Sequence, residues 1–304
     1  MSSAPEATRR TLATAAIVEG VGLFTEKRVR CSILPSDPGT GLCFRRTDLP
    51  DANDVRAEID SLATTPVHPA FAQIPPRHTA VTASGSPEAV VYTTEHILAA
   101  LIGMGITDAR VELDGAEVPI DDGSAVVFTD AIAGAGVRDT EPPTHVAPLT
   151  IDTTIVVSSP DGNASITAEP LGPGERPSYR YELDYGQSAP VPPQSAEWHG
   201  DTADFRDNIA PARTFSLAAE AQQMQALGLF RSFSPKDLLV IDDAGTPIDN
   251  AWRGDAEPAR HKLLDLIGDL ALVGRPIHAR VIAVRAGHAL NHAMASALIE
   301  AGAD

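Results

Sequence analysis

The chain is poor in cysteine and in aromatic residues. Its 304 residues include two cysteines, Cys31 and Cys43, and only 5% aromatic residues. The two cysteines could pair across neighbouring strands, but two reduced thiols in a cytoplasmic protein are the interpretation we favour. Because aromatic residues are scarce, we expect a core built mainly from alanine, valine, leucine and isoleucine, which 43% hydrophobic residues are enough to supply.

Positive charge is also scarce. Lysine and arginine number 23 against 41 aspartate and glutamate residues, and the formal net charge is −18. Affinity for phosphate backbones and for anionic lipid surfaces comes from clustered lysine and arginine. The composition therefore argues against a nucleic-acid partner and against a polybasic membrane surface.

Long apolar runs are missing as well. No stretch reaches the 18 or more residues of a membrane helix, and the best run, residues 97–106, has the length of a buried helix. Arg9 and Arg10 precede an apolar stretch as in a signal peptide, but Glu19 interrupts it and no small-residue cleavage site follows. We expect a cytoplasmic protein without a transmembrane segment.

What the chain does contain is a repeated pattern. His96 stands near the start of a predicted helix that continues through Leu-Ile-Gly to a strand beginning Ala-Arg-Val. His261 begins the same series in the second half, with the same spacing to Leu-Ile-Gly. We interpret the two halves as a diverged duplication of one strand-rich α+β unit. Facing halves would bring both helix-start histidines to one interface, where ligand sites are common.

A proline-rich polar stretch, residues 139–148, is the best linker in the chain. It predicts an N-terminal α+β domain over 1–140 and a C-terminal α+β domain over 146–304. Apolar patterning and turn residues predict the remaining elements. Strands are expected at 11–18, 29–34, 42–45, 109–113, 151–157, 164–170, 179–185, 238–241 and 279–284, and helices at 97–103, 125–133, 216–226, 258–273 and 291–301.

His261 and Asp265 have the spacing of a metal-binding pair. Positions four apart lie on one helix face, so an imidazole and a carboxylate can bind the same ion there. Alone the pair is a weak signal, since such contacts are common on solvated helix surfaces. His96, from the matching place in the other half, would supply the third protein ligand that a catalytic zinc site requires.

Two further residues suit proton transfer. Glu95 precedes His96 and could take a proton from an attacking water, although an acidic residue in a first helical turn is also favoured by the helix dipole. His288 follows Gly287 at the end of a predicted strand, where it could protrude into a cleft and protonate a leaving nitrogen. An ordinary loop histidine is the alternative.

Five separated motifs occur in an order that is specific to one family. The chain resembles the UDP-3-O-acyl-N-acetylglucosamine deacetylases, the zinc amidohydrolases of lipid A biosynthesis, from about residue 9 to 300. The motifs are Thr94-Glu95-His96, Glu117-Val118-Pro119-Ile120 with Asp122-Gly123-Ser124, Ala212-Arg213-Thr214-Phe215, His261-Lys262 with Asp265, Gly268 and Asp269, and Gly287-His288-Ala289-Leu290-Asn291.

The resemblance implies zinc, with Fe²⁺ as a possible metal in the cell. It implies His96, His261 and Asp265 as metal ligands and Glu95 as the base. It also implies a fold of two similar α+β domains, each a sheet with helices, whose helices pack between the sheets in a layered sandwich.

The remaining roles come from the same resemblance. His288 would be the acid, Asp269 would orient it, and Thr214 would hydrogen-bond the oxyanion. Lys262 and Phe215 would contact the substrate, a small UDP-linked acylated amino sugar. The implied reaction converts UDP-3-O-acyl-N-acetylglucosamine to UDP-3-O-acyl-glucosamine plus acetate, and we expect a monomer.

The chain departs from the family pattern at two places. Phe24 stands where relatives carry a histidine, and residues 230–236 replace a glycine-containing stretch that helps line the acyl-chain passage. That stretch belongs to an insert at about 217–250, in which Phe233 falls on one of the glycine positions. Two other functions stay open: a degenerate paralogue that binds an acylated sugar nucleotide or a partner protein without turnover, and an amidohydrolase for a different acylated amino sugar.

Overall fold

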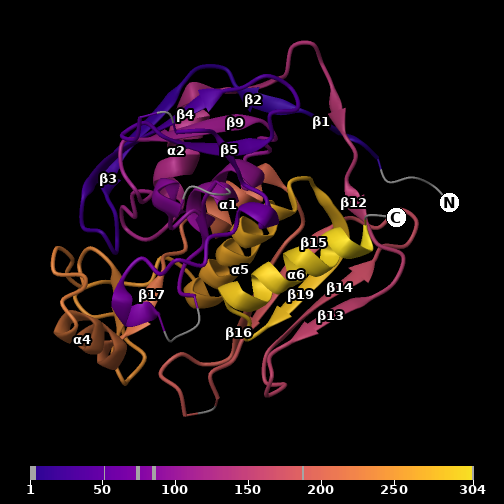
Figure 1. Cartoon of the computed structure of the whole chain (residues 1–304). Coiled ribbons are helices and arrows are strands. Elements are labelled where there is room, and N and C mark those ends of the chain that lie inside the picture. The colour runs from indigo at the N-terminus through magenta and orange to yellow at the C-terminus, as the bar shows by residue number, and fades with distance from the viewer. Residues whose placement is uncertain (1–4, 51, 73–75, 84–86, 187, 303–304) are drawn as a thin grey trace.

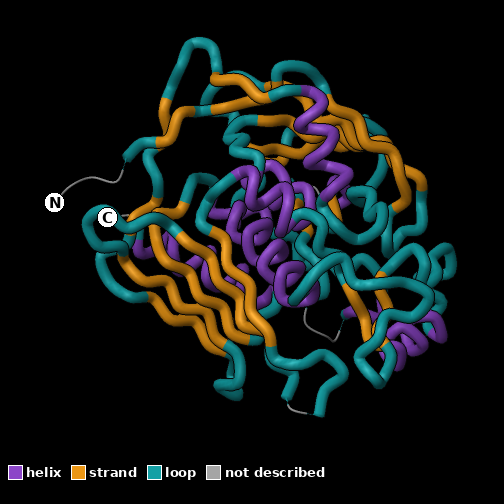
Figure 2. Tube along the Cα trace, turned by 180° about the vertical axis from the view of Figure 1, so that it is seen from behind, coloured by secondary structure: helices purple, strands orange, loops and turns teal. Residues whose placement is uncertain are grey.

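Helices lie between two sheets in this molecule (Figures 1 and 2). The computed structural model describes residues 5–50, 52–72, 76–83, 87–186 and 188–302. Residues 1–4 and 303–304, at the ends of the two predicted domains, lie outside this range. No helix in the described part is long and apolar enough to cross a bilayer.

The N-terminal sheet has the strand order β3-β4-β9-β5-β6. β5 and β9 run parallel, and the other neighbours run antiparallel. Alternate residues of β4, Val29, Cys31 and Ile33, are buried, as expected for a sheet covered by helices on one face. The bounds are β3 (Ala16–Val21), β4 (Arg28–Pro35), β5 (Leu42–Arg46), β6 (Val55–Arg56) and β9 (Ala109–Leu113).

The C-terminal sheet repeats this topology. Along its order β13-β14-β19-β15-β16 one neighbouring pair, β15 with β19, again runs parallel, and β12 adds a second parallel pairing with β19. The shared order and directions confirm the predicted duplication. The bounds are β12 (Leu149–Thr150), β13 (Ile155–Ser158), β14 (Ser165–Pro170), β15 (Ser178–Leu183), β16 (Gln194–Trp198) and β19 (Ile277–Val284).

Four helices fill the space between the sheets. In each half one helix precedes the central strand and one follows it: α1 (Glu95–Gly103) and α2 (Val126–Ala135), then α5 (Glu257–Leu270) and α6 (His288–Ala301). α1 packs against α5, and α5 also packs against β15 and α6. The layered α+β fold class is therefore confirmed.

Short elements connect these layers. β1 (Ala7–Thr8) pairs with β11 (His145–Val146), β2 (Arg10–Leu12) with β10 (Val137–Asp139), β7 (Ala80–Val81) with β8 (Val91–Tyr92), and β17 (Phe215–Leu217) with β18 (Leu239–Ile241). The remaining helices are α3 (Thr202–Asp204), α4 (Ala218–Ala226), the 3-10 turns η1 (Ile59–Ser61), η2 (Pro69–Phe71), η3 (Pro87–Ala89) and η5 (Ala271–Val273), and the π-helical turn η4 (Phe205–Ile209).

Several predicted boundaries were wrong. The strand predicted at 11–18 is two strands, because the chain leaves one small sheet after Leu12 and joins the main sheet at Ala16. The helix predicted at 216–226 begins at Ala218, after β17, and the last helix begins at His288 instead of 291. Cys31 and Cys43 are buried and free, since β9 separates the strands that carry them.

Candidate metal centre

Three predicted ligands converge where α1 meets α5. His96, His261 and Asp265 are buried, and each offers a ligand atom within 4.8 Å of the others. Oδ1 of Asp265 lies 3.3 Å from Nε2 of His261 and 3.6 Å from Nε2 of His96. His261 and Asp265 share one face of α5, as their spacing predicts, while His96 comes from the other half of the chain.

The donor set suits zinc. Nδ1 of His261 lies 3.2 Å from the carbonyl oxygen of Ala212, so an N–H there leaves Nε2 free to face the site. Burial lowers the pKa of His261 to about 3, which keeps the ring neutral as a ligand must be. Burial works against ionisation of Asp265, but its two imidazole neighbours and the ammonium of Lys262 hold the pKa of that carboxyl well below the usual range. Two imidazoles and one carboxylate leave one tetrahedral position open.

Lys262 binds the second carboxylate oxygen of Asp265. Its Nζ donates to Oδ2 of Asp265 at 2.8 Å, while part of its side chain stays exposed. Burial disfavours the ammonium, yet Asp265 raises the pKa of Lys262 above its ordinary value. The permanent charge beside the centre suits an anionic substrate.

Glu95 is the first residue of α1 and is 3% exposed. Its Oε2 accepts a hydrogen bond from the backbone N–H of Thr79 at 2.9 Å. Burial raises the pKa of Glu95 to about 7. A carboxylate with that pKa can accept a proton near neutral pH.

His288 is the first residue of α6, so it projects from a helix start, three residues before the predicted start of that helix. Its Nδ1 lies 2.8 Å from Oδ2 of Asp269, which also accepts from Nδ2 of Asn291 at 2.8 Å. Burial alone would lower the pKa of His288, but Asp269 raises it to about 9 through its charge and hydrogen bond. The ring is therefore a proton donor at neutral pH.

Thr214 and Phe215 enter from the segment beside His261. The backbone N–H of Thr214 donates to the carbonyl of Gly123 at 2.7 Å, and Gly123 has φ of +84°. A Cβ at Gly123 would stand 2.8 Å from Cγ2 of Thr214, so the glycine allows this close approach. In the described residues the Thr214 hydroxyl has no hydrogen-bond partner. Phe215 packs edge-on to Tyr185 with ring centroids 6.5 Å apart.

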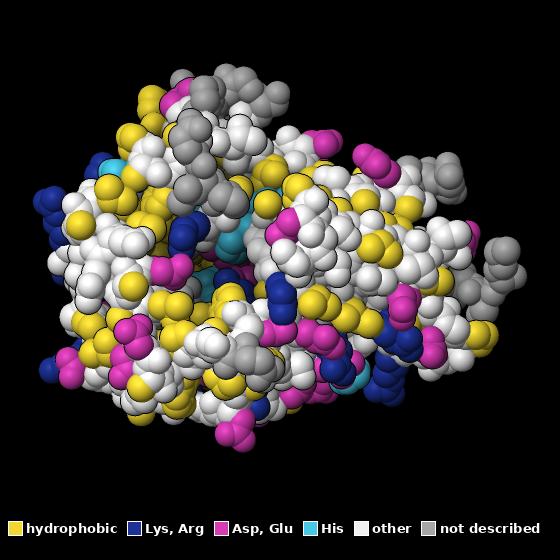
Figure 3. Space-filling model, turned by 90° about the horizontal axis from the view of Figure 1, so that it is seen from below, with side chains coloured by type: hydrophobic (Ala, Val, Ile, Leu, Met, Phe, Trp, Pro, Cys, Tyr) yellow, Lys and Arg dark blue, Asp and Glu magenta, His cyan; other side chains and the backbone are white. Residues whose placement is uncertain are grey.

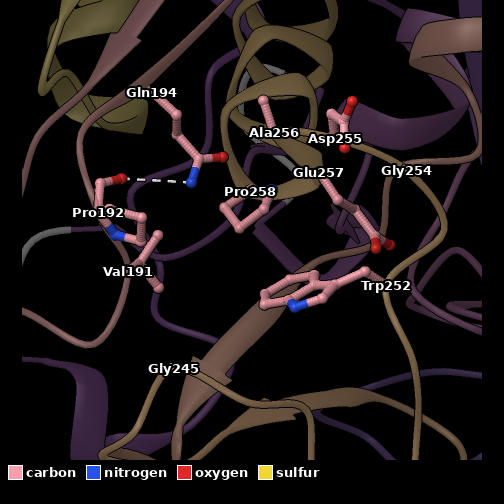
Figure 4. A pocket seen from close by; sticks show the side chains of 10 residues that line it. All are labelled: Val191, Pro192, Gln194, Gly245, Trp252, Gly254, Asp255, Ala256, Glu257 and Pro258. Carbon is pink, nitrogen blue, oxygen red and sulfur yellow. Dashed lines mark hydrogen bonds between the residues drawn. The ribbon is translucent and has the colours of Figure 1, made fainter.

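Histidine side chains lie at the bottom of a hollow on one face of the molecule, with basic side chains beside them (Figure 3). A separate cavity of about 440 Å³ lies at the start of α5, between Trp252, Pro258 and the 191–194 segment (Figure 4). None of the predicted site residues lines it.

The sequence patterns did not predict the polar side chains around Asp269 and His288. Thr79, Asn291 and His292 surround Asp269. Asn291 is the last residue of the motif that begins at Gly287, and its place in that motif could have indicated a role near His288. Thr79 lies in an irregular segment far from the others in sequence, and no local pattern marks it.

Comparison with known proteins agrees with this geometry. The profile of the family described as LpxC, UDP-3-O-acyl N-acetylglycosamine deacetylase, matches residues 9–300. A UDP-3-O-acyl-N-acetylglucosamine deacetylase of Myxococcus xanthus (strain DK1622) is 36% identical over 93% of this chain and 84% of its own length. Proteins with the same description from Geobacter sp. (strain M21) and Trichormus variabilis (strain ATCC 29413 / PCC 7937) are 32% and 33% identical, each over 96% of this chain and over 89% and 98% of their own lengths.

The match spans nearly the whole chain and includes the three buried residues that could hold a metal ion. The chain therefore belongs to the LpxC family, the zinc-dependent UDP-3-O-acyl-N-acetylglucosamine deacetylases of lipid A biosynthesis.

Proposed function

We propose that Glu95 and His288 act as base and acid when this chain hydrolyses the acetamide of UDP-3-O-acyl-N-acetylglucosamine. One observation carries the assignment: a buried carboxylate and a buried imidazole, with pKa values raised to about 7 and about 9, border one three-ligand metal site. Two titratable groups in such different environments suit the two halves of an acid–base reaction.

A zinc ion held by His96, His261 and Asp265 would supply Lewis-acid polarisation of the amide carbonyl and a lowered pKa for water. Glu95 takes one proton from the attacking water as its oxygen bonds to the carbonyl carbon. His288 then gives its proton to the amide nitrogen as the C–N bond breaks. Acetate and the free amine leave, and Asp269 stabilises the imidazolium until the proton is transferred.

Thr214 is the proposed donor to the developing oxyanion. Its unpartnered hydroxyl and its position two residues from Ala212, which holds His261, support this role. A donor of this kind contributes on the order of 3 kcal/mol to transition-state stabilisation. The exposed part of Lys262 and the ring of Phe215 are proposed to contact the UDP-linked sugar.

The acyl chain is proposed to pass the insert at about 217–250. Phe230, in this insert, packs against Phe24 with ring centroids 5.6 Å apart, and Phe24 also contacts Phe71 and His78 at 5.4 and 4.9 Å. Both departures from the family pattern therefore meet in one aromatic cluster (Phe24, Phe71, His78 and Phe230). This cluster is the proposed determinant of chain-length preference.

The wider assignments are part of the same proposal. We assign the N-terminal domain to 1–140 and the C-terminal domain to 146–304, and we propose a monomeric enzyme that works in the cytoplasm. A binding-only paralogue would have no need for a buried base and a buried acid, whose desolvation lowers stability. This argues for turnover.

Replacing Glu95 by Gln tests the proposal. The amide is nearly isosteric and can still face Thr79, but it cannot take a proton from water. We expect unchanged zinc content and a fall of at least about 100-fold in acetate release, measured by mass spectrometry on the UDP-linked substrate. Near-normal turnover of Glu95→Gln would refute the base assignment.

A further inference from the structure

Thr79 is the one described residue whose hydrogen bonds reach both the base and the carboxylate that orients the acid. It is fully buried and directly precedes β7. Its carbonyl accepts from the backbone N–H and the hydroxyl of Thr94, at 3.0 and 3.2 Å, which fixes the segment against the start of α1. Its N–H donates to Oε2 of Glu95.

The direction of the two short bonds at the Thr79 hydroxyl can be assigned, and its third contact, with Nδ1 of His288, is 3.5 Å long. Asp269 is ionised, because His288 lowers its pKa against the effect of burial, so its Oδ1 can only accept. The hydroxyl therefore donates to Oδ1 of Asp269. Nε2 of His292 lies 2.7 Å from the same hydroxyl oxygen and must donate to it. This fixes His292 as the Nε2–H tautomer, and burial keeps that ring neutral by lowering its pKa.

The Thr79 hydroxyl completes the set of hydrogen bonds to the Asp269 carboxylate. Oδ2 already accepts from His288 and Asn291, each at 2.8 Å. Among the described residues the Thr79 hydroxyl makes the only hydrogen bond to Oδ1, and Nε2 of His292, at 3.8 Å, is too far to replace it without a shift. A buried carboxylate oxygen left without a donor is costly. The carboxylate would then turn toward His292 and draw Oδ2 away from His288.

We propose that Thr79 is a positioning residue that holds Glu95 and the Asp269–His288 pair in register across the two halves of the chain. The inference rests on the proposed roles of Glu95 and His288. Thr79 itself need not touch substrate: its N–H sets the base, and its hydroxyl sets the acid through Asp269. Misplacing a reacting group by about 1 Å is enough to cost about 100-fold in rate.

Thr79→Val and Thr79→Ser separate the hydroxyl from the rest of the side chain. Valine keeps the shape and the backbone N–H but removes the hydroxyl, and serine restores it. We expect Thr79→Val to lower kcat by about 10- to 100-fold with KM and zinc content unchanged, and Thr79→Ser to stay within about 3-fold of the wild type. Thr129→Val is the matched control, since Thr129 is also buried and, among the described residues, its hydroxyl bonds only the helix carbonyl of Val126.

If Thr79 had only a structural role, Thr79→Val would lower stability without a selective fall in kcat at unchanged KM. Thr79→Ser would then not restore kcat. If Thr79→Val is insoluble, Thr79→Ala is measured in its place with the same expectation. Unchanged kcat in the soluble variant that lacks the hydroxyl overturns the proposal.

A double-mutant cycle tests whether the hydroxyl acts through Asp269. In an Asp269→Asn background, Thr79→Val should change kcat by less than about 2-fold, because the carboxylate that it positions is gone. Equal losses in both backgrounds would overturn the inference. Glu95→Gln, measured alongside, separates failure of this inference from failure of the proposed function. If Glu95→Gln stays active, the assignment of the base is wrong. If Glu95→Gln is inactive while Thr79→Val has normal activity, only the role of Thr79 is wrong.

Discussion

Gly268 lies directly against the backbone of Glu95. A Cβ built at Gly268 would stand 2.0 Å from the Glu95 carbonyl oxygen and 3.0 Å from its Cα. This contact is where α5 meets α1, and the absent side chain lets the two helices approach closely. The helix that carries His261 and Asp265 can therefore reach the helix that carries His96.

Gly268→Ala should separate α1 from α5. The atom that the new methyl group would meet is backbone, so the helices must shift to relieve the overlap. We expect a loss of about 1–3 kcal/mol in the free energy of unfolding, measured by urea denaturation, and at least a 10-fold fall in kcat/KM. Gly134→Ala is the control: Gly134 lies on α2 with open space around its Cα, and alanine there should be neutral or stabilising. Equal effects in both variants would contradict the close-contact argument.

His261→Ala and Asp265→Ala should each lower zinc content. Removing either one leaves two protein donors, which is too few for a stable catalytic zinc site. Metal analysis of protein purified without added metal would show a fraction well below one zinc per chain. His199→Ala removes an exposed histidine instead and should leave the content unchanged. Full occupancy in both site variants would rule out the ligand assignment.

Activity should fall at alkaline pH as His288 loses its proton. Asp269 raises the pKa of His288 to about 9, so the acid is present below that pH and is lost as the pH rises through it. Burial lowers the pKa of His288 and the negative charge of Asp269 raises it. Asp269→Asn removes that charge, so the pKa of His288 should fall. The alkaline limb of kcat/KM should move to lower pH by at least about one unit. An unmoved limb would mean that a different group sets it.

Phe230→Gly should shift preference toward longer acyl chains. Phe230 has φ of +58°, which glycine adopts without strain, and its ring closes the aromatic cluster against Phe24. Each buried methylene is worth about 0.8 kcal/mol, or roughly 4-fold in kcat/KM. The measurement is kcat/KM over a series of acyl lengths. Phe233→Gly tests the neighbouring ring that the sequence alone indicates, and identical ranking of the series in both variants and the wild type would exclude this segment from specificity.

Local sequence determined the parts of this protein that depend on periodicity. The spacing of His261 and Asp265 places both on one helix face whatever the fold, because the α-helical repeat is fixed by backbone geometry. The repeated histidine and Leu-Ile-Gly series likewise indicated two matching units, and the two sheets have the same strand order. The proposed roles of Thr214 and Asp269 came from the family motifs, because no spacing rule identifies them.

Tertiary structure alone decided which distant segments meet. The hydroxyl of Thr79 bonds Asp269 across 190 positions of sequence, and Phe24 meets Phe230 from the opposite half of the chain. Such contacts depend on how whole layers pack, and packing is set by the summed burial of many apolar side chains instead of by any local pattern. Glu95 and His288 could be named from sequence, but their raised pKa values arise only from the burial and the neighbours that this packing provides.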